Sequence, residues 1–159
     1  MNKQQVVGKI IAHLEQEIEL FRRAAKSAFE EATHEQSKAE NKYDTRGLEA
    51  SYLARGQARQ VADAEDALAQ FRTLFLAGSV AQTEVCSGAL VELERGRARE
   101  WYYVAPCAGG TEVQHDGQDI LVITPQSPLG RQLIGRSPGE SVTLAIGGKN
   151  QRQKVITVL

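Results

Sequence analysis

Two stretches of the chain carry apolar or small residues at steps that alternate between four and three, and this pattern limits the possible folds most. The first stretch contains Val7, Ile11, Leu14, Ile18, Phe21, Ala25, Ala28 and Ala32. The second contains Gly47, Ala50, Ala54, Gln57, Val61, Ala64, Leu68, Phe71 and Phe75. No proline interrupts either stretch, so each predicts an amphipathic helix with one apolar seam. Because the break from Thr33 to Arg46 is short, we expect an antiparallel coiled-coil hairpin over residues 1–77, with its tip at about 33–47.

After Gly78 the pattern changes to that of β-strands separated by turn signals such as "AGG", "HDG" and "GGKN". The predicted strands are Gly88–Glu94, Trp101–Val104, Asp119–Ile123, Ser141–Ile146 and Lys154–Leu159. Residues 127–135, "SPLGRQLIG", predict one short helix, because Ser127 suits the N-cap, Pro128 the first turn and Gly135 the stop. The predicted fold class is therefore α+β, with the hairpin followed at 78–159 by a small, mainly antiparallel sheet domain with one short helix.

The charge balance of the chain argues against a general nucleic-acid-binding protein. The 159 residues include 19 Lys and Arg and 20 Asp and Glu, for a net charge of −1, whereas such proteins carry a basic face. We expect no independent, sequence-specific binding to DNA. The N-terminus has no signal-peptide pattern, and no window approaches the ~20 apolar residues of a membrane span. The expected location is the cytoplasm, without a membrane partner.

The sheet half shows no complete catalytic motif, which argues against an enzyme with its own active site. Cys86 and Cys107 are too few for a disulfide framework or a metal cage. His115 lies in the turn-like segment "VQHDGQD", so we expect it at the surface. In the run from Trp101 to Tyr103, alternation predicts that the first and third rings share one sheet face, where core packing is favoured over a binding patch.

The hairpin tip is dense in charge. Glu35, Glu40 and Asp44 lie there, with Lys42 and Arg46 between and beside them. One interpretation is an exposed, solvated turn. The other is a set of oxygen ligands that completes a Mg²⁺ site left unfinished by another macromolecule, because Mg²⁺ often takes only one or two protein carboxylates.

One segment, "ITPQSPLGRQLIGRSPGESVTL", is similar to the C-terminal signature of the bacterial Gre transcript-cleavage factors. That signature reads S-P-h-G-x-A-h-h-G, where h is apolar, and then x-x-G-[DE]-x-V leading into a strand. In this chain Gln132 stands at the Ala position. The hairpin half resembles the family through its architecture and through "EN" and "Y" at Glu40, Asn41 and Tyr43.

The resemblance implies an FKBP-like sheet domain that docks at the rim of the secondary channel of bacterial RNA polymerase. It implies that the coiled coil enters the channel, where Glu40 and Asp44 would help to hold a second Mg²⁺ and a water. The polymerase would then cut its own backtracked RNA, so the factor would be an accessory protein with no cofactor of its own. Its contact with nascent RNA would be indirect. FKBP-like here refers to the fold, and prolyl isomerase activity does not follow.

The tip departs from the family pattern, G-D-L-S-E-N-A-E-Y. With the shared "EN" aligned, Glu40 takes the Glu position, but Ser37 stands where the family has Asp. Asp44 or Glu35 would have to replace that Asp. A regulator or inhibitor that occupies the channel without stimulating cleavage therefore stays open, as does an adaptor whose hairpin dimerises.

The other candidate contacts with a partner are Glu35, Lys42 and Arg46 at the tip, together with Arg131 and Gln132 on the short helix. For the last two, a purely structural helix is the alternative.

Overall fold

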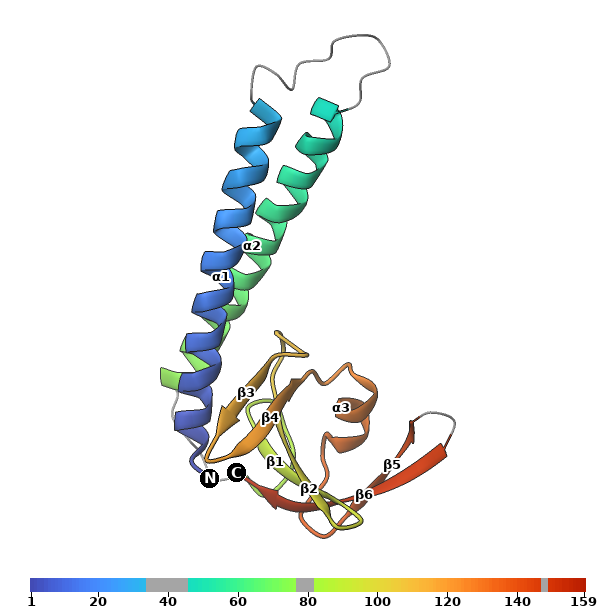
Figure 1. Cartoon of the computed structure of the whole chain (residues 1–159). Coiled ribbons are helices and arrows are strands. Elements are labelled where there is room, and N and C mark those ends of the chain that lie inside the picture. The colour runs from blue at the N-terminus through green and yellow to red at the C-terminus, as the bar shows by residue number, and fades with distance from the viewer. Residues whose placement is uncertain (34–45, 77–81, 147–148) are drawn as a thin grey trace. The chain divides into compact units, whose positions relative to one another are not determined.

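The computed structural model describes residues 1–33, 46–76, 82–146 and 149–159 (Figure 1). The chain divides into two compact units. The sheet unit consists of Met1–Ile11 and Gln70–Leu159, and the arm unit consists of Ala12–Ala69. The predicted boundary after residue 77 lies outside the described residues. No helix in the described ranges is long and apolar enough to cross a membrane.

The predicted hairpin helices are confirmed as α1 (Lys3–Thr33) and α2 (Arg46–Leu76), each of 31 residues. Within the arm unit they run side by side in opposite directions (Figure 1). The seam residues Leu14, Ile18 and Leu68 are buried there, as the periodicity predicts. At a rise of ~1.5 Å per residue, each helix is about 46 Å long.

Six strands form one mixed sheet in the order β3-β4-β2-β1-β6-β5. They are β1 (Leu90–Arg95), β2 (Ala98–Val104), β3 (Glu112–His115), β4 (Gln118–Ile123), β5 (Ser141–Ile146) and β6 (Lys149–Val158). Four of the five neighbouring pairs are antiparallel, and β2 pairs with β4 in parallel, Trp101 lying opposite Ile120. The short helix α3 (Pro128–Leu133) follows β4. The mainly antiparallel sheet with one short helix is thus confirmed.

The expected surface position of His115 is wrong. The turn that follows it contains only Asp116 and Gly117, with φ of 51° and 73°. Such a pair with positive φ closes a two-residue hairpin, and Asp-Gly suits it well. His115 is therefore the last residue of β3, opposite Gln118 of β4, and its exposed fraction is 6%.

Both faces of the central strands are buried. One face carries a core that includes Val91, Val104 and Leu133 of α3. On the other face, Leu90 and Tyr103 are paired across β1 and β2 and are buried. Alternation along each strand explains this division, since successive side chains point to opposite faces.

The helix ends inside the sheet unit cover this second face. Phe71 of α2 packs on Tyr103 with ring centroids 5.9 Å apart, and both side chains are buried. Lys9 Nζ of α1 donates a 2.6 Å hydrogen bond to the Gln114 carbonyl oxygen of β3. Burial raises the pKa of the Tyr103 phenol to about 12. The sheet unit therefore has two apolar layers, one under α3 and one under the helix ends.

Gln153 of β6 provides a stability test of the first layer. Its side chain is 2% exposed, and within the described residues its Oε1 accepts no hydrogen bond. A buried unpaired acceptor costs about 1–3 kcal/mol. We expect Gln153→Leu to raise the free energy of unfolding by about 1 kcal/mol in urea denaturation. Gln151→Leu is the matched control, because Gln151 Oε1 accepts from Arg95 at 3.0 Å, and this variant gains nothing. A loss of stability in Gln153→Leu would contradict the prediction.

Candidate functional site

The predicted tip residues Glu35, Glu40, Lys42 and Asp44 lie outside the described residues. Arg46 begins α2, and its side chain is outside the description as well. The structure therefore neither brings these side chains together nor separates them, and their metal-binding and partner-binding roles stay predictions. Within the described ranges, no three His, Cys, Asp or Glu side chains converge as a metal site would require.

Below the tip, a charge pair joins the two helices of the arm unit. The Arg22 guanidinium donates to Glu65 of α2 at 2.6 Å and to Glu19 of its own helix at 3.0 Å. The hydrogen bond to Glu65 is the main cause that raises the pKa of Arg22. These side chains are exposed, so the pair contributes little to stability. It marks one point at which α1 and α2 lie side by side within the arm unit.

Large apolar side chains are exposed on the tip half of the arm. Five of them are more than half exposed, namely Leu20 and Phe29 of α1 and Leu48, Tyr52 and Leu53 of α2. Leu48 and Tyr52 are four residues apart, so they lie on one helix face. They form a small exposed apolar pair on α2.

The segment that resembles the Gre signature folds around α3, and its small residues have identifiable roles. Ser127 Oγ accepts the N–H of Gly130 at 3.0 Å and donates to the Thr124 carbonyl oxygen at 2.7 Å. Ser127 is thus the N-cap, with Pro128 in the first turn, as predicted. A Cβ on Gly130 would lie 2.0 Å from the Thr124 oxygen, so only glycine allows this close approach. Gly135, with a φ of 79°, ends the segment.

Arg131 and Gln132, the two predicted docking residues on α3, have different environments. Arg131 is exposed, and its Nε donates to the Gln126 carbonyl oxygen at 2.8 Å, which leaves the outer guanidinium nitrogens open to solvent. Gln132 is partly buried, and its Oε1 accepts the N–H of Thr143 in β5 at 3.1 Å. Ile134, just after the helix, is 42% exposed. Arg131 and Ile134 can therefore reach a partner, while the Gln132 amide oxygen already holds α3 to the sheet.

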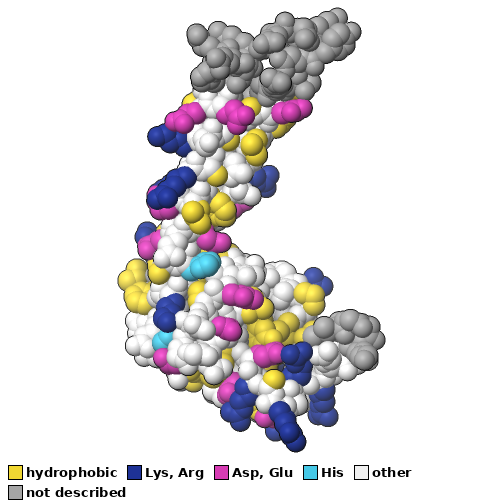
Figure 2. All heavy atoms as spheres, viewed as in Figure 1, with side chains coloured by type: hydrophobic (Ala, Val, Ile, Leu, Met, Phe, Trp, Pro, Cys, Tyr) yellow, Lys and Arg dark blue, Asp and Glu magenta, His cyan; other side chains and the backbone are white. Residues whose placement is uncertain are grey.

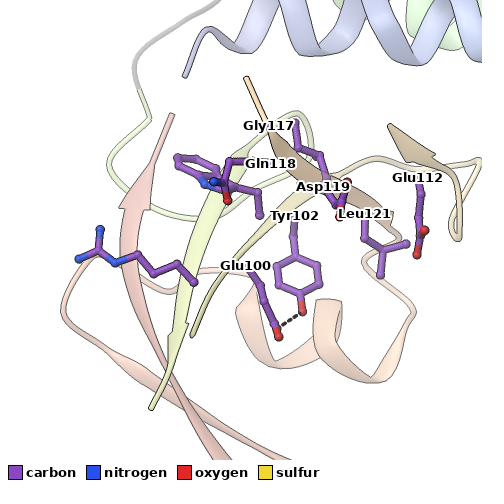
Figure 3. A pocket seen from close by; sticks show the side chains of 10 residues that line it. Glu100, Tyr102, Glu112, Gly117, Gln118, Asp119 and Leu121 are labelled. Carbon is purple, nitrogen blue, oxygen red and sulfur yellow. Dashed lines mark hydrogen bonds between the residues drawn. The ribbon is translucent and has the colours of Figure 1, made fainter. Parts of the chain in front are cut away.

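A pocket of about 330 Å³ lies beside β2 and β4 (Figure 3). Tyr102 points into this region and its phenol donates to Glu100 Oε2 at 2.7 Å. Burial, and then this hydrogen bond, raises the pKa of Tyr102. The Arg95 guanidinium binds the other oxygen of Glu100. Glu112 and Asp119 also line the pocket, so three carboxylates belong to its lining.

Sequence reasoning missed this pocket because it missed β3, which supplies Glu112. Only the alternation of Glu112, Val113, Gln114 and His115 signals that strand, and four residues are too few to separate it from a loop. The ten lining residues in the described chain include no Ser, Cys, His or Lys. Its ionisable side chains are the three carboxylates of Glu100, Glu112 and Asp119, together with Arg99 and Tyr102.

No family model and no curated protein matches the sequence. Among solved structures, the GreA factor homolog 1 (Gfh1) protein of Thermus thermophilus is 21% identical over 94% of both chains, with a TM-score of 0.37. Thermus aquaticus Gfh1 is 21% identical over 92% of both chains, with a TM-score of 0.41. The transcription elongation factor GreA/GreB from Nitrosomonas europaea is 19% identical over 55% of this chain and 78% of that chain, with a TM-score of 0.38. Likeness at this level assigns neither a family nor an activity to this chain.

The geometry around Gly130 yields a stability prediction. We expect Gly130→Ala to lower the free energy of unfolding by about 2–4 kcal/mol, because its Cβ would collide with the Thr124 carbonyl oxygen and displace the Ser127 cap. Gly56→Ala is the matched control, since no atom lies within 4 Å of the added Cβ and Gly56 is inside α2. That variant should gain about 0.5–1 kcal/mol from helix propensity. Equal effects in chemical denaturation would refute the role given to Gly130.

Proposed function

We propose that this protein is a Gre-like accessory factor of bacterial RNA polymerase and not an enzyme with its own active site. The observation that carries the proposal is the α3 segment, in which Ser127, Pro128 and Gly130 occupy the positions that the S-P-h-G signature requires. A hairpin of two 31-residue helices precedes this segment in the chain, as in the family that the sequence resembles. Neither feature alone is specific, but their order in one chain supports the proposal.

In the proposed binding mode, the sheet unit docks at the rim of the polymerase secondary channel and the arm enters the channel. The exposed Arg131 and Ile134 are candidates for the docking contact. On the arm, Phe29 and Tyr52 expose enough apolar surface to contact the channel wall. Such a factor acts where the polymerase is, in the cytoplasm.

At the tip, Glu40 and Asp44 would contribute carboxylate oxygens to a Mg²⁺ ion shared with the polymerase. The ion and the water that it activates would belong to the polymerase active site, so the factor would need no resident cofactor. Glu35, Lys42 and Arg46 would contact the polymerase inside the channel. The residue types support this part of the proposal, because charged oxygen donors are what Mg²⁺ prefers.

A second candidate is a regulator that enters the same channel without stimulating cleavage. Ser37 favours it, since this residue stands at the position where the family has Asp and a hydroxyl is a weaker ligand for Mg²⁺ than a carboxylate. A third candidate, an adaptor that dimerises through the hairpin, is favoured by the exposed apolar side chains of the arm.

A transcript-cleavage assay tests the first candidate. The protein is added to a stalled, backtracked elongation complex, and RNA length is followed with time. We expect shortening that falls at least about 100-fold in rate for the double variant Glu40→Ala with Asp44→Ala, because loss of metal ligands removes transition-state stabilisation. Asp63→Ala is the matched control, because this exposed carboxylate of α2 lies far from the tip in sequence.

The outcomes separate the three candidates. Shortening that survives in the double variant would refute the tip assignment. Polymerase binding without shortening, but with altered pausing or initiation, would favour the regulator. Absence of polymerase binding in a pull-down, together with a dimeric mass in light scattering, would leave the adaptor.

A further inference from the structure

One face of the sheet is rich in basic side chains near the β1–β2 turn. We call it the basic sheet face and define it by Arg97 of the turn, Arg99 and Trp101 of β2, and Arg152 and Lys154 of β6. The register aligns Arg99, Glu94 and Lys154 in one row across β2, β1 and β6, and Trp101 and Glu92 in the next. Figure 2 shows Lys and Arg side chains gathered where the β1–β2 turn and β6 lie.

Acidic residues neutralise only part of this charge. The basic sheet face carries four basic residues, Arg97, Arg99, Arg152 and Lys154, and the acidic residues aligned with them on β1 are Glu92 and Glu94. Arg99 binds Glu92 at 3.2 Å and lies 4.0 Å from Glu94. Both carboxylates are therefore engaged by one arginine. Within the described residues, Arg97, Arg152 and Lys154 have no acidic partner, and all three are exposed.

The remaining side chains of this face suit a phosphate backbone. Thr143 of β5 lies opposite Arg152 and is exposed, so its hydroxyl can donate beside the guanidinium. Arg152 and Lys154 are two residues apart on one face, which places them about 7 Å from each other along the strand. Cations and hydroxyls at this spacing can contact successive phosphates of one strand.

Trp101 adds a flat aromatic surface to the same face. It is partly exposed, unlike Tyr103 two residues along, which is buried under Phe71. It lies one row from Arg99 and directly opposite Glu92. Sheet faces that bind single strands combine such a ring, on which a base stacks, with basic residues that follow the backbone.

We propose that the basic sheet face binds single-stranded nucleic acid, with Arg97, Arg152 and Lys154 on the phosphates and Trp101 under a base. The net charge of −1 conceals this surface, because the excess of basic residues is confined to one end of one sheet. An acidic protein segment would satisfy the cations equally well, but it would make no use of the exposed ring. The proposal is independent of the polymerase assignment, since it concerns the isolated chain and a different set of residues.

The chain contains one tryptophan, so its intrinsic fluorescence reports on this face without a label. An RNA strand of about 15 nucleotides and the corresponding DNA strand are titrated into the full-length protein at salt from about 50 to 200 mM. We expect both strands to quench the fluorescence, and a duplex of the same sequence to do so more weakly. Affinity should fall steeply with salt, because phosphate contacts release counterions.

The triple variant Arg97→Ala, Arg152→Ala, Lys154→Ala should weaken binding at least about 10-fold at the lowest salt. It should also reduce the slope of log affinity against log salt by about 2, since each single-strand phosphate contact accounts for about 0.7. The matched control removes three exposed basic residues of the arm unit, Arg23, Lys26 and Arg59, and leaves both quantities unchanged. Trp101→Leu, followed by anisotropy of a labelled strand, should weaken binding about 10-fold without changing the slope.

Three results would overturn the proposal. The first is no binding of either strand at the lowest salt. The second is an equal effect of the triple variant and the arm control. The third is binding of poly-glutamate as tight as that of RNA, with no loss in Trp101→Leu, which would identify an acidic protein as the ligand. Because all the substituted cations are exposed, circular dichroism of each variant should match that of the parent protein.

Discussion

The packing of Phe71 on Tyr103 is the contact on which the organisation of the sheet unit depends. Tyr103 lies on β2, and its strand is buried on the opposite face as well, where Val104 belongs to the core under α3. A strand covered on both sides needs an apolar partner on each. The ends of α1 and α2 supply the second partner, so the first and last turns of the hairpin belong to the same compact unit as the sheet.

The local patterns predicted most elements well. The apolar residues of α1 and α2 recur at steps of four and three, a pattern that requires only one buried stripe along each helix. Leu14 and Leu68 of these stripes are buried. Ser141–Ile146 was predicted to the residue, because turn signals bound it on both sides. The signals at Ser127, Pro128 and Gly135 are equally local, since each acts on the backbone within one turn.

The missed features depend on contacts between distant parts of the chain. The parallel pairing of β2 with β4 joins Trp101 to Ile120 and leaves no periodic signal in either strand. His115 was misplaced because its neighbours Asp116 and Gly117 dominate the local pattern, while its burial is decided by β4 and the layer beyond it. The close approach of Gly130 to Thr124 is likewise invisible in sequence, although the glycine itself is part of the recognised signature.

For the candidate sites, too, the sequence predicts local features, whereas contacts between distant residues appear only in the structure. The residue types and the resemblance identify the tip carboxylates as candidates. Whether they hold a metal depends on the distances between their oxygens in space, which the sequence does not give. Arg131 and Gln132 are adjacent in sequence, yet one is exposed and the other is bound to β5, a difference set by the fold of α3 on the sheet. The basic sheet face was missed because an overall charge balance averages over surfaces that the fold separates.

The hydrogen bond from Thr143 to Gln132 has a consequence for how molecules of this protein meet one another. β5 is an edge strand, and its outward N–H groups are what an incoming strand of another chain would pair with. The side-chain oxygen of Gln132 accepts the hydrogen bond of one of these N–H groups, that of Thr143. The family signature has alanine at this position, and alanine has no side-chain acceptor. A strand of another molecule could pair with β5 at this point only if the Gln132 side chain moved away and its hydrogen bond with Thr143 broke. The loss of that hydrogen bond opposes the extension of the sheet from one molecule into the next.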